Sequence, residues 1–161
     1  MGFTTRCFIR KNSKELQKKL ADIGYSVCRC ANFTNAEWLA AFPINGTVHG
    51  KGYFDAEMEL PDWKVEEELN RFVSRNPKYV DCGENEDLFI AIAALRDDSD
   101  IHQWFVTDVD QHWVNIGLYM PKGSFELCLI DDKYMHQDGL HLTSAVPSHK
   151  ATVEELIKHF K

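Results

Sequence analysis

The sequence has no long hydrophobic run. Its longest uninterrupted apolar stretch is Leu88–Leu95, whereas a membrane-spanning helix needs about 20 such residues. No apolar segment follows the basic residues near the N-terminus, so a secretory signal is not predicted. Low-complexity sequence is also missing, and the 44% hydrophobic and 27% charged residues are typical of a globular protein. These absences predict a cytoplasmic protein with no membrane partner.

The cysteines lack the pattern of a disulfide framework or a structural zinc site. They are five in number, which is odd, and no two are spaced as C-x-x-C; they are Cys7, Cys28, Cys30, Cys82 and Cys128. In a cytoplasmic protein, such thiols are most simply small hydrophobic side chains of the core. We therefore expect neither a disulfide nor a bound metal, and no motif indicates a cofactor.

Positive charge is in the minority. Lysine and arginine number 18 against 25 aspartates and glutamates, which gives a formal net charge of −7. Such a balance disfavours nucleic-acid backbones and anionic membrane surfaces as general partners. A protein or small-molecule partner is compatible with the charge, but the sequence does not identify it.

Hydrophobic periodicity and capping residues predict helices and strands in alternation. Four helices are predicted: about Ser13–Gly24, Val65–Val73, Asn85–Arg96 and Val153–Phe160, the last opened by the capping box Thr152-Val153-Glu154-Glu155. Predicted strands are Phe3–Ile9, Tyr25–Ala31, Trp38–Phe42, Thr47–Phe54, Tyr79–Asp81, Gln103–Thr107, His112–Met120, Phe125–Ile130 and Leu140–Ala145. Asn45-Gly46 predicts a hairpin turn.

No linker or internal repeat interrupts this pattern. At 161 residues, the chain is long enough to bury a core without disulfides or metal. We therefore expect one α+β domain spanning residues 1–161, with a largely antiparallel sheet, a buried central helix, and flanking N- and C-terminal helices.

The predicted strands after residue 100 suggest a catalytic arrangement. With the turn placed at Lys122-Gly123, Met120 pairs with Phe125 and Leu118 with Leu127, so that one face is apolar. His112 and Asp131 then meet at the end of that face. A carboxylate that orients an imidazole is the base half of a nucleophilic triad.

Cys82 can supply the other half of such a triad. It lies just ahead of the predicted central helix, at the positive end of the helix dipole, which is a typical position for a nucleophilic cysteine. The order of Cys82 before a helix, then His112 and Asp131 on strands, resembles transglutaminase-like and papain-like enzymes. The resemblance implies that Cys82 is the nucleophile, His112 the base and Asp131 the group that orients it.

Two further stretches resemble other proteins. Gly2–Asn12 and the segment from Asp81–Phe89 through Ala91–Asp98 are similar to stretches in a set of short, uncharacterised bacterial proteins. This resemblance implies a small bacterial protein and brings no activity, ligand or partner with it.

Two functional hypotheses of different class remain open, with a weaker third. The preferred one is a non-catalytic cytoplasmic binding domain, because the same residues also read simply as a core helix and core strands. The alternative is a cysteine-dependent hydrolase or acyltransferase that uses Cys82, His112 and Asp131. The third is a metal-binding loop whose carboxylates and imidazoles are Asp131, Asp132, His136, Asp138 and His141.

Overall fold

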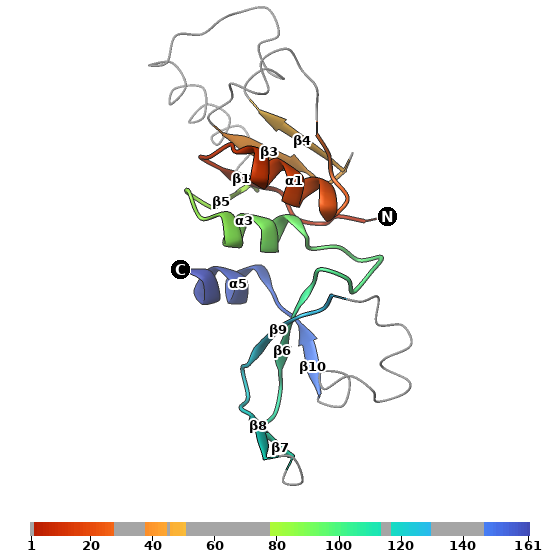
Figure 1. The fold of residues 1–161 in the computed structure, drawn as a ribbon, viewed down its shortest axis with the longest axis vertical. Helices are drawn as coiled ribbons and strands as arrows, with labels where there is room; N and C mark the ends of the chain where they lie inside the picture. The colour runs from red at the N-terminus through yellow and green to blue at the C-terminus, as the bar shows by residue number, and fades with distance from the viewer. Residues whose placement is uncertain (1, 28–37, 45, 51–77, 114–116, 130–146) are drawn as a thin grey trace, which may run out of the picture. The chain divides into compact units, whose positions relative to one another are not determined.

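The computed structural model describes residues 2–27, 38–44, 46–50, 78–113, 117–129 and 147–161 (Figure 1). These residues form the predicted α+β mixture, in which antiparallel pairing dominates. Contacts between Cα atoms divide the chain into two compact units, made mainly of residues 2–95 and of residues 96–159. We call them the N-terminal and C-terminal units. No helix among the described residues is long and apolar enough to cross a membrane.

The N-terminal unit is built on a five-stranded sheet of order β2-β4-β3-β1-β5. Its strands are β1 (Cys7–Ile9), β2 (Ser26–Val27), β3 (Leu39–Phe42), β4 (Thr47–Gly50) and β5 (Val80–Asp81). Strand β3 is antiparallel to β1 and β4, while β5 runs parallel to β1 and β2 runs parallel to β4. The predicted hairpin around Asn45-Gly46 is confirmed by the β3–β4 pairing, and Gly46 has a φ of 59° in its turn.

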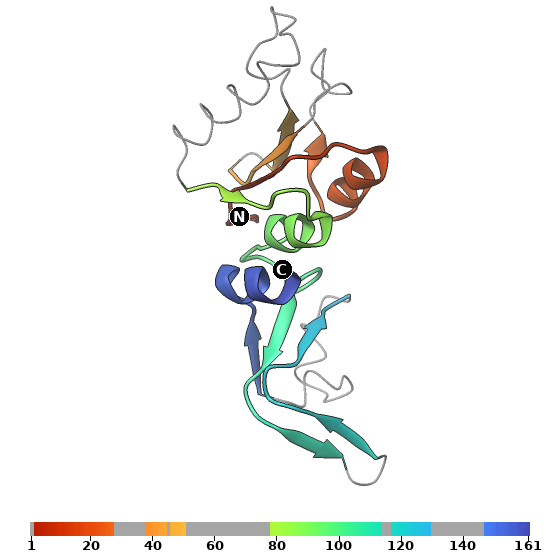
Figure 2. The same ribbon diagram turned by 90° about the vertical axis from the view of Figure 1, so that its left-hand side faces the viewer.

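Helices α1 (Lys14–Asp22) and α3 (Glu86–Ala93) also belong to the N-terminal unit and contact each other (Figure 2). Both begin at the caps that the sequence predicts. The Ser13 side chain accepts a hydrogen bond from the Leu16 amide at 3.1 Å, and the Asn85 side chain accepts one from the Leu88 amide at 3.1 Å. Side chains capping in this way satisfy amides that would otherwise lack partners in the first helical turn.

Strand β1 lies between β3 and β5 in the sheet and is buried on both faces. On one face, Phe8 belongs to a core cluster with Trp38, Ala40 and Tyr79. On the other face, the Cys7 thiol lies 3.9 Å from the Phe89 carbonyl of α3. The expectation of a buried central helix is confirmed, because most of the α3 side chains are buried.

The C-terminal unit contains a three-stranded antiparallel sheet of order β10-β6-β9. These strands are β6 (Trp104–Thr107), β9 (Phe125–Leu127) and β10 (Ser148–Lys150), followed by helix α5 (Val153–Phe160). The predicted capping box at Thr152 and Glu155 is present. The His159 ring of α5 stacks on the Phe125 ring of β9, with 4.0 Å between centroids, so the helix covers part of the sheet.

A separate two-stranded ribbon, β7 (Gln111–Trp113) paired with β8 (Leu118–Met120), replaces the predicted meander. The expected single strand His112–Met120 is wrong, because the chain turns back within it, and Gly117 in that turn has a φ of 65°. A left-handed conformation of this kind suits glycine, which has no Cβ. The ribbon continues the β6–β9 register: Val106 faces Phe125, and further along Gln111 faces Met120.

This register corrects the predicted apolar face. Met120 pairs with Gln111 instead of Phe125, and Leu118 pairs with Trp113 instead of Leu127. Leu118, expected on the apolar face, is 37% exposed, and Leu129 of the predicted strand Phe125–Ile130 is 67% exposed. The predicted turn at Lys122-Gly123 is present, with the Ser124 amide donating to the Pro121 carbonyl at 3.2 Å and Gly123 at a φ of 87°. It interrupts the chain between β8 and β9, however, and does not join two strands that pair with each other.

Several predicted elements lie wholly or partly outside the described residues. The helix Val65–Val73 and the strand Leu140–Ala145 lie entirely outside them, as does the proposed metal loop. Strand β10, which the sequence did not predict, begins just after that gap. That residues 1–161 form one domain stays a prediction.

Candidate functional site

Cys82, the predicted nucleophile, lies in the N-terminal unit directly after β5. It is 4% exposed, and its backbone amide donates a hydrogen bond to the Phe8 carbonyl at 3.0 Å, which extends the pairing with β1. Its thiol lies 3.9 Å from the carbonyl of Val80. The Cys82 side chain is therefore buried where the edge of the sheet meets α3. This position agrees with the interpretation of Cys82 as a core residue.

His112, the predicted base, lies on β7 in the C-terminal unit and is exposed. It faces Tyr119 across the ribbon, and the two rings stack with 4.2 Å between centroids and 23° between planes. Asp131, the predicted orienting group, lies outside the described residues. The register that placed His112 beside Asp131 was wrong, and the catalytic use of Cys82, His112 and Asp131 stays a prediction.

The ribbon exposes apolar side chains on both of its faces and at its base, since Leu118 and Tyr119 are successive residues of β8 and Val109 directly precedes β7. Val109 is 40% exposed, Leu118 37% and Tyr119 51%, and the stacked His112 ring adds to them. We call these four residues the ribbon surface. In both views, β7 and β8 extend beyond the ends of β6 and β9 (Figures 1 and 2). The C-terminal unit therefore presents apolar and aromatic groups on a projecting element.

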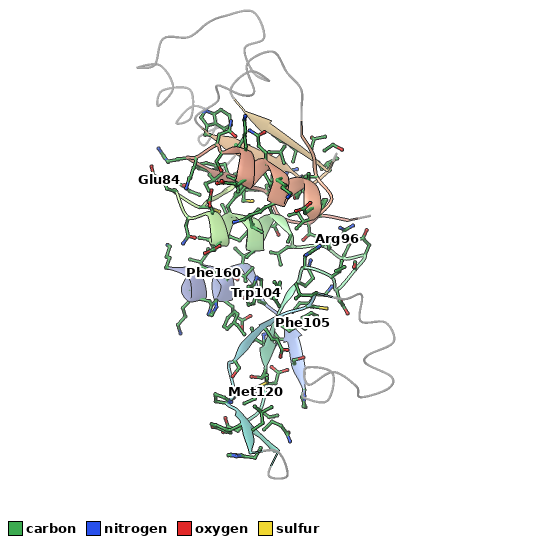
Figure 3. All side chains as sticks on the ribbon, in the orientation of Figure 1. Glu84, Arg96, Trp104, Phe105, Met120 and Phe160 are labelled. Atoms are coloured by element: carbon green, nitrogen blue, oxygen red, sulfur yellow. The ribbon has the colours of Figure 1, made fainter. Side chains whose placement is uncertain are left out.

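Met120 marks the base of the ribbon (Figure 3), where β8 ends, and hydrogen bonds fix the chain there. One carboxylate oxygen of Asp110 accepts from the Lys122 amide at 2.7 Å and from the Tyr119 hydroxyl at 3.4 Å. The Thr107 hydroxyl donates to the Pro121 carbonyl at 2.9 Å and accepts from the Ser124 amide at 3.0 Å. These bonds span both strands where the ladder is interrupted, so they set the direction in which the ribbon leaves the sheet.

A second polar arrangement in the C-terminal unit centres on His149 of β10. Its Nδ1 lies 2.6 Å from an oxygen of Asp108, and its Nε2 lies 3.0 Å from an oxygen of Glu155. Hydrogen bonds to Glu155, and then to Asp108, raise the pKa of His149 above its ordinary value. Because both ring nitrogens are engaged, the imidazole connects β10, the end of β6 and the start of α5, and neither nitrogen is open to a substrate.

Neither this arrangement nor the ribbon surface was predicted from the sequence. The capping box identified Glu155, but nothing in the spacing of Asp108, His149 and Glu155 indicates that they meet. The described residues contain no group of three or more histidine, cysteine or acidic side chains placed to hold a metal ion. Apolar residues such as Leu118 were assigned to the core, since sequence pattern does not distinguish a buried strand face from an exposed one.

Known proteins add no assignment to this geometry. No family model, curated protein or solved structure matches the chain. The function therefore has to be argued from the residues of the two units themselves.

Proposed function

We propose that the protein is a non-catalytic cytoplasmic binding domain whose ribbon surface contacts a partner protein. The observation that carries this proposal is the joint exposure of Val109, Leu118 and Tyr119 on one projecting ribbon. Isolated exposed apolar residues are ordinary, but several of them, one aromatic, on both faces and at the base of a single protruding element favour an interaction site. Tyrosine is among the residues that contribute most to interfaces.

The energetics favour a partner that covers this surface. Moving apolar area out of water gains roughly 25 cal/mol per Å², and the ribbon leaves such area in water. The base hydrogen bonds of Asp110 and Thr107 orient the ribbon before binding, which lowers the entropy lost when a complex forms.

The negative charge of this chain indicates which residues should surround the apolar patch of a partner that binds the ribbon. The chain carries a net charge of −7, and the acidic side chains of Asp108 and Asp110 stand at the base of the ribbon. A rim of basic residues on the partner would complement this field and speed association. The proposed occupant is accordingly a protein with an apolar patch bordered by lysine or arginine.

Affinity capture with matched variants tests the proposal. We expect the wild-type chain to retain a defined protein from a lysate of its source cells, and the double variant Leu118→Ser/Tyr119→Ser to retain at least about tenfold less, because interface anchors contribute ~1.4 kcal/mol or more each. The control is Ile44→Ser, which removes an 81% exposed apolar side chain from the other unit. Equal capture by both variants would contradict the proposal, as would self-association of the wild-type chain through the ribbon.

A further inference from the structure

Strand β9 is an edge strand of the sheet in the C-terminal unit. In the order β10-β6-β9 (Figure 1), it pairs with β6 on one side, and no strand of the described residues pairs with it on the other. An edge strand presents backbone N–H and C=O groups to which an extended segment of another protein can add as a further strand. This edge lies outside the ribbon surface, so binding there would be separate from the proposed contact of the ribbon.

The pairing with β6 shows which backbone groups of β9 point outward. The Thr107 amide, at the end of β6, donates to the Ser124 carbonyl at 3.0 Å, just before β9 begins. In an antiparallel pair, only alternate residues of a strand direct their backbone groups to the partner strand. Glu126 therefore directs its N–H and C=O groups to β6, whereas those of Phe125 and Leu127 point to the outer edge.

The side chains along this edge alternate between apolar and acidic. Phe125 and Leu127 share the face that α5 covers, because the Phe125 ring stacks on the His159 ring of that helix. Glu126 lies on the opposite face. Leu129, two residues beyond Leu127, is 67% exposed. An added strand would thus meet apolar side chains on one face of the sheet and a carboxylate on the other.

Among the described residues, none donates a hydrogen bond to one carboxylate oxygen of Glu126. This oxygen, Oε2, is buried. Lys150 of β10 lies on the same face of the sheet, since it and Glu126 both pair with Phe105, but its ammonium group binds Asp100 at 2.9 Å. A buried charged acceptor without a donor costs free energy. A cation that an added strand brings to Glu126 would remove this cost.

We propose that the outer edge of β9 binds an extended segment of a partner protein as an additional strand, with a lysine or arginine opposite Glu126 and an apolar residue on each side of it. Residues directly opposite each other in a sheet share a face. The basic side chain therefore reaches the Glu126 carboxylate, while its apolar neighbours lie beside Phe125 and Leu127.

A second copy of this chain is a poorer occupant of the same edge. If β9 paired with itself in antiparallel fashion, Phe125 opposite Leu127, then Glu126 would lie opposite Glu126. Like charges directly opposite each other destabilise a sheet, and a charged residue in an edge strand discourages such self-pairing. The carboxylate thus selects a basic segment of a different protein.

Hydrogen exchange of single amides, followed by nuclear magnetic resonance, tests the backbone pairing in the wild-type chain. The probe is the synthetic peptide Ser-Thr-Ile-Lys-Val-Thr-Ser with both ends blocked. At saturation, the amides of Phe125 and Leu127 should exchange at least about tenfold more slowly than in the free chain. The Glu126 amide is the internal control, because it already faces β6 and its exchange should change little.

An exchange of charges tests the basic residue. Glu126→Lys should bind this peptide at least about fivefold more weakly than the wild-type chain does, and should bind better a matched peptide with glutamate in place of lysine. The control Glu84→Lys makes the same change of charge at an exposed position of the N-terminal unit and should keep the wild-type preference. Circular dichroism checks that each variant is folded.

Three results would overturn the proposal. One is unchanged exchange of the Phe125 and Leu127 amides at the highest soluble concentration of the lysine peptide; another is protection of other amides in their place. The third is equal binding of the lysine and glutamate peptides by the wild-type chain, which decides the matter even if Glu126→Lys does not fold. None of these measurements involves the ribbon surface, so the β9 edge and the proposed binding function stand or fall separately.

Discussion

At the residue scale, the bridge at His149 predicts a dependence of stability on pH. Hydrogen bonds to Glu155 and Asp108 raise the pKa of His149 above 6.5 in the folded chain. The protonated imidazole therefore stabilises the fold fully below pH 6.5, and this contribution is lost as the pH rises through the raised pKa. Because His149 is largely solvated, we expect a loss of about 1 kcal/mol or less.

Denaturant unfolding at a series of pH values from 5 to 9 measures this effect. Removing the imidazole in His149→Gln should make the free energy of unfolding fall less steeply as the pH rises. The matched control is His112→Gln, which removes an exposed histidine that no carboxylate of the described residues bridges. An equal decline in wild type and His149→Gln would show that the bridge does not link proton binding to folding.

Cys82 provides a residue-scale test between binding and catalysis. In a non-catalytic domain we expect iodoacetamide to alkylate Cys82 at pH 7 more than about tenfold slower than free cysteine, because the side chain is 4% exposed. The rate should be unchanged in His112→Ala. Peptide mapping by mass spectrometry reports Cys82 separately from the other thiols. Rapid alkylation that His112→Ala suppresses would instead support a cysteine-dependent hydrolase or acyltransferase.

At the scale of elements, the capping box of α5 predicts a defined stability cost. The Thr152 hydroxyl accepts from the Glu155 amide at 3.2 Å, and the Glu155 carboxylate accepts from the Thr152 amide at 2.8 Å. Thr152→Ala should lower the free energy of unfolding, measured with urea, by about 1 kcal/mol. Thr152→Ser keeps a hydroxyl at the cap and should retain most of the stabilisation that the cap provides. Identical midpoints for the two variants would mean that the cap contributes nothing.

The elements that sequence predicted well are those with local signals. Helices α1, α3 and α5 begin at Ser13, Asn85 and Thr152 as predicted, because a cap and the apolar face after it lie within a few residues. The β3–β4 hairpin likewise depends on one short turn. These signals need no knowledge of the rest of the chain.

The ribbon was mispredicted because its register is set by distant strands. The sequence analysis placed the strand pairing around the turn at Lys122-Gly123, whereas the structure turns the chain back before Gly117. The observed pairing is continuous with that of β6 and β9, and β6 also pairs with β10, which joins residues about 40 positions apart. Exposure of Leu118 and Tyr119 follows from that pairing, so the candidate binding surface could not be predicted from the sequence.

At the scale of the whole molecule, mutations in the core should lower the free energy of unfolding far more than mutations of the ribbon surface. Phe89→Ala empties a fully buried position beside β1 and should cost about 3–5 kcal/mol of unfolding free energy. Leu118→Ser/Tyr119→Ser should change it by only about 0.5 kcal/mol. Urea titrations compare the two directly, and a large loss in the ribbon variant would assign these side chains to stability instead of binding.

The expected single domain has its own test. If residues 1–161 fold as one domain, thermal unfolding should give one transition, and Phe89→Ala and Thr152→Ala, which lie in different units, should lower the same midpoint. Two separable transitions in calorimetry, each shifted by only one of these variants, would show that the two compact units unfold independently.

Site-specific photo-cross-linking inside cells tests the binding surface most directly. With a photoreactive amino acid at position 119, illumination should give one defined protein adduct that Leu118→Ser weakens. The same amino acid at Lys18, on the exposed side of α1, should not give that adduct. No adduct at position 119, or the same adducts from both positions, would contradict the assignment of the ribbon as the surface that binds a partner protein.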